Sequence, residues 1–251
     1  MSGELLPKLP PSVKTRLGKS THTDYRTPVI RGLIFDLDGT LVDSLPGIAT
    51  ALNHALEDLD LPKHPQEAVE TFIGDGVRNL VIRALGKDHA NRQEDLLAAF
   101  QKHYSADWKT GTQPYPGFVR LLEELQQRKI PMAVLSNKPH EYTVEIVETL
   151  FPQNFFTPVQ GHQEDYPKKP DPTTAHQIIS DWNLKPEEVA YVGDSTVDLA
   201  TARNGNMTPL IFSWGYGTPE NFPLLESIDD FRSAIAGAEW VDTASFRNRI
   251  S

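Results

Sequence analysis

Two aspartates follow an apolar run near the start of the chain. The run 33–35 is typical of a buried strand, and Asp36 and Asp38 lie directly after it, within the segment 36–40. In an extended chain, residues two apart point to the same side. Two carboxylates that are removed from water repel each other strongly, so the pair requires a compensating partner, most simply a divalent cation. The segment therefore predicts a metal-assisted carboxylate site at the end of a strand.

Three further segments combine polar side chains with a predicted strand end or helix start. They are 135–138 with Ser136 and Asn137, 168–172 with Lys168 and Lys169, and 191–198 with Asp194, Ser195 and Asp198. In an open parallel sheet, the turns that follow the strands converge on one crevice. We therefore expect these side chains to meet Asp36 and Asp38.

The residue types in this crevice suit phosphoryl transfer. A carboxylate such as Asp36 can attack phosphorus and form an aspartyl-phosphate. The transferred group spreads its charge over its oxygens, which the Ser136 hydroxyl, backbone amides and the Lys169 ammonium could hold. Asp38 could give a proton to the leaving group and later take one from water. Mg²⁺ prefers oxygen ligands, which Asp36 and Asp194 can supply, with Asp198 as a further candidate.

Taken singly, these segments also have structural interpretations. Ser136 and Asn137 could mark an ordinary strand exit, and two adjacent lysines could be a solvated pair. Asp194 or Ser195 could cap a helix, and Asp198 could be an acid in its first turn. Their joint occurrence, in this order and at predicted turns, favours the catalytic interpretation.

The elements expected around these segments belong to the α/β class. From about residue 114 onward, helical and strand patterns alternate, whereas residues 46–113 show only helical patterns. Strands are expected at 29–35, 130–135, 155–159, 189–193 and 209–212, and helices of the alternating part at 118–127, 142–150, 173–182 and 197–203. Such alternation predicts a doubly wound (Rossmann-like) parallel sheet core, 29–45 and 114–237, with an inserted α-helical cap domain, 46–113.

Composition limits the partners of the chain. With 251 residues and a net charge of −10, we expect neither nucleic acid nor an anionic membrane as the main partner. The chain has no cysteine, which excludes disulfides and thiolate sites. Residues 1–28 are basic and proline-containing; we expect a disordered or loosely docked extension, with a targeting peptide as the alternative. Residues 238–251 are expected to form a loose tail, and the protein to be a cytoplasmic monomer or homodimer.

The four polar segments together resemble the haloacid dehalogenase-like superfamily of aspartate-nucleophile phosphatases, over about residues 29–237. Residues 36–44 match the first motif of that family without departure. The resemblance implies that Asp36 is the nucleophile and a Mg²⁺ ligand, and that Asp38 is the general acid and base and a ligand through its backbone carbonyl. The remaining implied roles are phosphate or substrate binding by Gly39, Thr40, Ser136 and Asn137, the third-motif lysine at Lys169, and metal binding by Asp194 with Asp198 as its supporting partner.

The position of the helical insert resembles the phosphoglycolate phosphatase-like branch, as do residues 74–85, 115–117 and 214–217. This resemblance implies a small anionic phosphate ester, with 2-phosphoglycolate as the first candidate. Such a substrate carries a carboxylate, with which Arg78, ahead of Arg83, could pair. Amides near Gly76 at a helix start would also favour an anion. Alternatively, Arg78 lies on a solvated helix face.

Other functions remain open at this point. A sugar phosphomutase or a pyrophosphatase would use the same nucleophile, and a non-catalytic binding protein could keep the same fold. A dehalogenase is not expected, because that branch lacks the second aspartate, which is present here as Asp38. Trp214 and Tyr216 are expected to be packing residues rather than substrate contacts.

Overall fold

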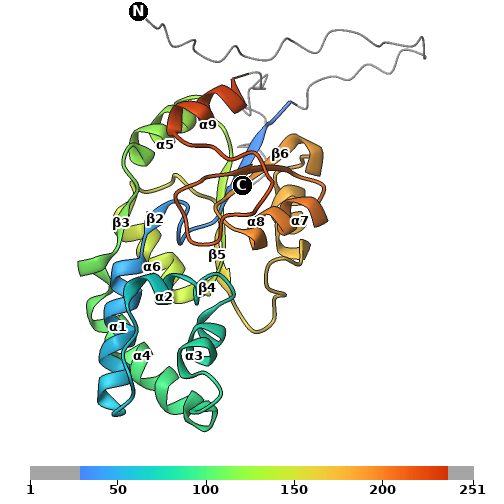
Figure 1. The fold of residues 1–251 in the computed structure, drawn as a ribbon. Coiled ribbons are helices and arrows are strands. Elements are labelled where there is room, and N and C mark those ends of the chain that lie inside the picture. Colours follow the sequence, from blue (N-terminus) through green and yellow to red (C-terminus); the bar gives the residue numbers. More distant parts are fainter. Residues whose placement is uncertain (1–28, 237–251) are drawn as a thin grey trace, which may run out of the picture.

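The computed structural model of the chain describes residues 29–236 (Figure 1). The expected N-terminal extension, 1–28, and the C-terminal tail, 238–251, lie outside the described residues. Within the described part, no helix has the length and apolar character needed to cross a bilayer.

A five-stranded parallel sheet forms the centre of the core. Its strands are β1 (Gly32–Phe35), β4 (Met132–Pro139), β5 (Val159–His162), β6 (Val189–Gly193) and β7 (Thr208–Ile211). The spatial order is β5-β4-β1-β6-β7, so β1 is central, with Leu33 opposite Met132 on one side and Ala190 on the other. All four residues of β1 are buried, which explains its apolar composition.

Helices cover both faces of the sheet, as the alternating sequence pattern predicts (Figure 1). Leu33 and Phe35 pack into one apolar cluster with α5 (Phe118–Gln127), α6 (His140–Leu150) and α9 (Ile228–Ile235). Ile34, which points the other way, packs with α7 (Thr173–Asp181), and α8 (Thr196–Asn204) joins the same second cluster. The predicted doubly wound α/β fold is therefore confirmed.

A helical cap is inserted after the first strand and lies below the core in Figure 1. Its helices are α1 (Leu45–Asp58), α2 (Gln66–Glu70), α3 (Val77–Leu85) and α4 (Gln93–Asp107), with 3₁₀ turns at Ala90–Arg92 and Trp108–Gly111; a third 3₁₀ turn, Pro186–Glu188, belongs to the core. The chain enters the cap through β2 (Val42–Asp43) and leaves it through β3 (Gln113–Pro114), and these two strands pair antiparallel.

Two strands differ from the sequence-based expectation. β4 continues to Pro139 rather than ending at Leu135, because an irregularity in its pairing lets Pro139 lie opposite His162. The polar residues 136–138 therefore belong to the end of the strand. β5 starts only at Val159, since the apolar Phe155 and Phe156 pack into the core before the strand begins.

Candidate active site

Three carboxylates meet at the carboxyl end of the sheet. Asp36 follows β1 directly, Asp194 follows β6 directly, and Asp198 lies in the first turn of α8. One oxygen from each lies within 4.8 Å of the others, and all three side chains are buried. The parallel topology is responsible, because it brings the ends of the neighbouring strands β1 and β6 to the same edge.

Lys169 connects two of these carboxylates. Its Nζ lies 2.7 Å from Asp198 Oδ1 in a hydrogen bond and 2.9 Å from Asp36 Oδ1 in an ion pair that lacks hydrogen-bond geometry. Although burial opposes the charged ammonium, Asp198 and Asp36 raise the pKa of Lys169 well above its usual value. Lys169 therefore stays charged beside Asp36, whereas the neighbouring Lys168 is only half-buried.

The side chain of Asp198 is saturated by donors from the protein. While Oδ1 accepts the Lys169 bond, Oδ2 accepts bonds from Ser195 Oγ at 2.6 Å, Ser195 N at 3.1 Å and Asp194 N at 3.2 Å. Ser195 Oγ in turn accepts from Asp198 N, which completes a capping box at the start of α8. In this arrangement Asp198 holds Lys169 and the helix end, while its expected role as a further metal ligand stays a prediction.

Asp194 is held from two sides. Its Oδ1 accepts a 2.7 Å bond from Thr40 Oγ1, and its Oδ2 accepts a 2.8 Å bond from Tyr216 N. Thr40 is completely buried and its hydroxyl supports Asp194, while its expected role in substrate binding stays a prediction. Gly39 has φ +81°, and a Cβ there would lie only 2.5 Å from Asp194 Oδ2, which accounts for the glycine.

Asp38 points to the same crevice from the turn after β1. Its Oδ1 accepts a 2.6 Å bond from Ser44 Oγ, and Lys138 Nζ donates to Oδ1 and Oδ2, both at 3.0 Å. Burial opposes the charge of Lys138, but Asp38 raises the pKa of this ammonium above its usual value. The expected general acid and base is therefore ion-paired to a buried lysine.

The charges of the site fit a divalent cation. Burial, reinforced by Asp198 and against the effect of Lys169, raises the pKa of Asp36 to about 6. Burial, together with Asp198 and Asp36, also raises the pKa of Asp194 well above its usual value. Because close buried carboxylates resist ionisation together, a bound cation would relieve this repulsion. Asp36 and Asp194 thus suit an oxygen-preferring ion such as Mg²⁺.

The two polar residues at the end of β4 behave differently. Ser136 is buried beside Asp36 in the lining of a pocket, and its Oγ accepts a 3.4 Å bond from Lys138 N. The Asn137 side chain donates to the carbonyls of Gly74 and Lys169, both at 3.1 Å, and accepts from Lys169 N at 2.9 Å. Asn137 therefore ties the lysine segment and a cap loop to β4 through its side-chain amide, while its expected role in phosphate binding stays a prediction.

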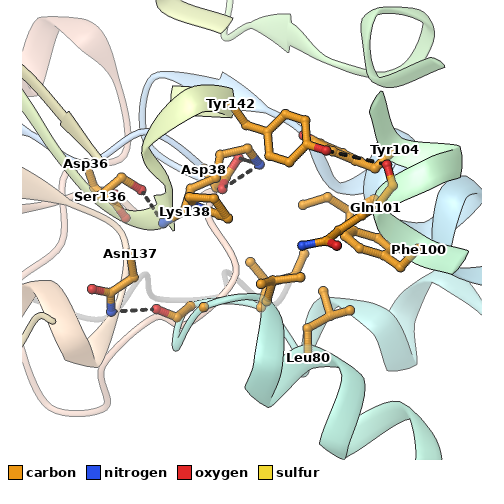
Figure 2. A pocket seen from close by; sticks show the side chains of 16 residues that line it. Asp36, Asp38, Leu80, Phe100, Gln101, Tyr104, Ser136, Asn137, Lys138 and Tyr142 are labelled. Atoms are coloured by element: carbon orange, nitrogen blue, oxygen red, sulfur yellow. Dashed lines mark hydrogen bonds and ion pairs between the residues drawn. The ribbon is translucent and has the colours of Figure 1, made fainter. Parts of the chain in front are cut away.

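The pocket beside these residues encloses a cavity of about 60 Å³ between the core and the cap. Figure 2 shows Asp36, Asp38, Ser136, Asn137 and Lys138 on its core side, and Leu80, Phe100 and Tyr104 facing them from the cap. At roughly 15 Å³ for each water-sized group, the cavity has room for about four such groups. The space enclosed between core and cap is therefore small.

The cap residues expected to bind an anion are placed unequally. Gly76 lines the pocket with φ +90°, and a Cβ there would lie 3.1 Å from Lys168 Nζ, so a side chain would crowd the contact between cap and core. Arg78 pairs with Glu94 at 2.8 Å with both side chains mostly exposed, and it lines a separate cavity of about 330 Å³. Arg83 bonds to Asp75 and to Phe72 O. Neither arginine lines the pocket that holds Asp36.

Two residues of the site were not predicted from the sequence. Lys138 directly follows Ser136 and Asn137, so its position in the chain indicated that it could belong to the site. Its partner could not be predicted, because Asp38 lies 100 residues away in the chain. Tyr216 was expected only to pack, yet its hydroxyl accepts bonds from Ser44 N at 2.8 Å and Leu45 N at 3.0 Å and donates to Asp43 Oδ1 at 2.9 Å. No spacing along the chain indicates either contact.

Comparison with known families and proteins agrees with this geometry. The model of the family described as haloacid dehalogenase-like hydrolase matches residues 33–211. Proteins named phosphoglycolate phosphatase are similar to the chain. The one from Rhodospirillum rubrum is 34% identical over 81% of this chain and 88% of its own length, and the one from Aquifex aeolicus is 34% identical over 74% and 86%.

Solved structures show the same architecture. The crystal structure of a predicted phosphoglycolate phosphatase from Haemophilus somnus superposes with a TM-score of 0.68 at 28% identity, covering 78% of this chain and 89% of that one. A haloacid dehalogenase-like family hydrolase from Streptococcus pneumoniae superposes with a TM-score of 0.68 at 26% identity, covering 82% and 90%.

Proposed function

The chain belongs to the haloacid dehalogenase-like hydrolase family, and from this premise we propose that it is a Mg²⁺-dependent phosphatase acting on a small phosphate monoester, first of all 2-phosphoglycolate. Relatives that are 34% identical over most of their length are named phosphoglycolate phosphatases, which supports the reaction class. The observation that carries the proposal is the buried Asp36, with Lys169 at 2.9 Å, next to Asp194 and opposite a small pocket.

In the first half of the reaction, Asp36 is the nucleophile. One of its carboxylate oxygens forms a bond to phosphorus while the bond from phosphorus to the ester oxygen breaks. Asp38 gives its proton to the leaving oxygen, so that an alcohol departs. Lys169 and the Ser136 hydroxyl lie beside Asp36 and stabilise the negative charge on the phosphoryl oxygens.

In the second half, Asp38 takes a proton from water as the water oxygen attacks phosphorus. The bond between phosphorus and Asp36 breaks, which releases phosphate and restores the Asp36 carboxylate. Asp36, Asp194 and the backbone carbonyl of Asp38 would hold Mg²⁺, which when bound neutralises charge on the phosphoryl oxygens. Asp198 acts through Lys169, which it holds at 2.7 Å.

The cap completes the site by closing it. The Asn137 side chain reaches Gly74 O in the cap at 3.1 Å, while Ile73, Val77 and Leu80 cover the pocket. Closure of this kind excludes bulk water, so that charges inside interact more strongly. We propose that the cap opens for substrate entry and product release.

The test is phosphate release from a panel of esters, measured with Mg²⁺ and with a chelator. The panel contains 2-phosphoglycolate, sugar phosphates, nucleoside monophosphates and pyrophosphate. We expect Mg²⁺-dependent hydrolysis with a preference for 2-phosphoglycolate, abolished in Asp36→Asn and kept in the exposed control Asp165→Asn. Activity retained by Asp36→Asn would refute the mechanism.

The intermediate has its own test. p-Nitrophenyl phosphate has a leaving group that needs no proton, so Asp38→Asn should still undergo the first half-reaction and fail in the second. The mass of one phosphoryl group should then accumulate on the peptide that contains Asp36. Transfer to a bisphosphate without phosphate release would instead indicate a phosphomutase, and no turnover of any ester would indicate a binding protein.

A further inference from the structure

The cap offers the leaving group a mostly apolar wall. The apolar part of this wall consists of side chains from α1, α3, α4 and the loop before α3, namely Ile48, Ile73, Val77, Leu80, Phe100 and Tyr104. A carboxylate placed against such a wall would lose its hydration without gaining a partner, which is strongly unfavourable. An acidic substrate therefore needs a cation in the lining itself.

Lys138 is that cation. Of the sixteen described residues that line the pocket, it alone is a cation, and its side chain is only 6% exposed. Arg78 and Arg83 are engaged with Glu94 and Asp75 outside the lining. Lys169 already serves two carboxylates, Asp36 and Asp198.

The geometry of Lys138 leaves it able to bind a second anion. Two of the three N–H donors of an ammonium suffice for the contacts of 3.0 Å to the two oxygens of Asp38. The Nζ also lies 4.8 Å from the centroid of the Tyr104 ring, which reaches it from the cap. Lys138 thus lies between Asp38, which is the proposed acid for the ester oxygen, and Tyr104, which belongs to the apolar wall of the cap.

Gln101 supplies a neutral donor on the opposite side. Figure 2 shows its side chain extending from α4 toward the pocket, and its amide makes no hydrogen bond within the described residues. An amide NH₂ has two donors, which suit a carboxylate oxygen. Lys138 from the core and Gln101 from the cap therefore face the same space.

Resting on the proposed function, we propose that Lys138 and Gln101 form a subsite for a carboxylate on the leaving group and thereby select phosphate esters of small hydroxy acids. Because Lys138 and the ester oxygen share Asp38 as a neighbour, the selected carboxylate lies close to the ester oxygen. A long or neutral alcohol gains nothing from this subsite.

The first test measures binding and does not depend on turnover. 3-Phosphonopropionate, in which a methylene replaces the ester oxygen of 2-phosphoglycolate, and propylphosphonate differ in the carboxylate alone. With Mg²⁺ present, calorimetry should show that the wild-type protein prefers 3-phosphonopropionate. Lys138→Met should reduce that preference by roughly 10- to 100-fold, since hydrogen bonds to charged groups contribute on this scale. Equal affinity of the wild-type protein for the two phosphonates would overturn the proposal.

Matched variants distinguish a role of Lys138 in binding the carboxylate from a role in holding the structure of the site. Lys168→Met removes a neighbouring half-buried lysine that does not line the pocket, and it should keep the preference. Lys138→Arg should keep most of it, because the charge is retained. Gln101→Leu changes an exposed residue whose loss does not threaten folding, and it should reduce the preference by about 3- to 10-fold. If Gln101→Leu has no effect and Lys138→Met weakens both phosphonates equally, Lys138 only orients Asp38 and the subsite is refuted.

The second test compares kcat/KM for 2-phosphoglycolate and for 2-hydroxyethyl phosphate, its neutral analogue. We expect Lys138→Met to lower the ratio of the two values by the factor seen in binding. A wild-type protein that prefers the carboxylate in binding but hydrolyses neither ester would refute the proposed function and leave the subsite standing. Hydrolysis of both esters with an unchanged ratio in Lys138→Met would refute the subsite alone.

Discussion

Replacing Tyr216 by phenylalanine should loosen the linker through which the chain enters the cap. The Tyr216 hydroxyl accepts bonds from the backbone amides of Ser44 and Leu45 and donates one to Asp43. These amides belong to the start of α1, where a helix has N–H groups without partners of its own. The Ser44 side chain does not cap them, because its hydroxyl donates to Asp38 instead. One phenol oxygen therefore satisfies a helix end that the local sequence leaves open.

The expected loss follows from counting these bonds. Without the hydroxyl, the amide of the fully buried Ser44 has no acceptor, which costs about 1 to 3 kcal/mol, whereas the Leu45 amide keeps Asp43 Oδ1 at 3.3 Å. The bond to Asp43 adds about 1 kcal/mol. We therefore expect the free energy of unfolding to fall by about 2 to 4 kcal/mol, which lowers the Tm by roughly 4 to 16 °C for a domain of this size.

Thermal and urea unfolding, carried out with a chelator so that the protein stays free of metal, would measure this change in the free energy of unfolding. Tyr166→Phe is the matched control, because it makes the same substitution at a side chain that is 45% exposed, and it should change stability by less than about 0.5 kcal/mol. If Tyr216→Phe unfolds like this control, the hydroxyl does not satisfy the start of α1 and the reasoning fails.

Three further predictions concern charge in and around the site. Thr40→Val removes the 2.7 Å bond to Asp194 at nearly constant volume, so Mg²⁺ affinity measured by calorimetry should fall about 10-fold or more; an unchanged affinity would mean that Thr40 does not orient Asp194. Burial raises the pKa of Asp36 to about 6 in the metal-free protein, so below that pH a cation must displace a proton, and Mg²⁺ affinity should fall as the pH decreases from 7 to 5. A Mg²⁺ affinity that rises as the pH decreases from 7 to 5 would contradict this prediction. Arg78→Ala breaks an exposed pair with Glu94, so unfolding should show a loss of at most about 1 kcal/mol and phosphate release should be unchanged. A fall in phosphate release would contradict this prediction and assign Arg78 to substrate binding.

The sequence was most informative where a strand and its polar turn are contiguous. Asp36 and Asp194 each follow an apolar run, and a parallel sheet brings such ends to one edge whatever the length of chain between them. The choice of Lys169 over Lys168 came from the family resemblance, in which the third-motif lysine precedes Pro-x-Pro, as Lys169 does here. The structure buries Lys169 against Asp36 and leaves Lys168 half-buried.

Contacts between distant segments could not be predicted in this way. A charged residue in a helical pattern indicates that its helix face is exposed, but it does not indicate the partner. Nothing in the sequence near Arg78 therefore showed that it would form an ion pair with Glu94. The pairing of Lys138 with Asp38 arises only when β4 settles beside β1. For the same reason β4 was predicted too short. Its polar residues 136–138 suggest a turn, but they stay in the strand because Asn137 and Lys138 find partners on other elements in a buried setting.

The pairing of β2 with β3 has an evolutionary consequence. With Val42 opposite Pro114 and Asp43 opposite Gln113, the chain leaves the core and returns to it at neighbouring points. An insert with adjacent ends can be exchanged for another without redirecting any strand of the sheet, because the host must close only a short gap. The residues around Asp36, together with Lys138 on β4, would then be inherited with the host, and Gln101 and the apolar wall of the pocket with the insert. A grafted cap would therefore change the wall that faces the leaving group and keep the reacting carboxylates.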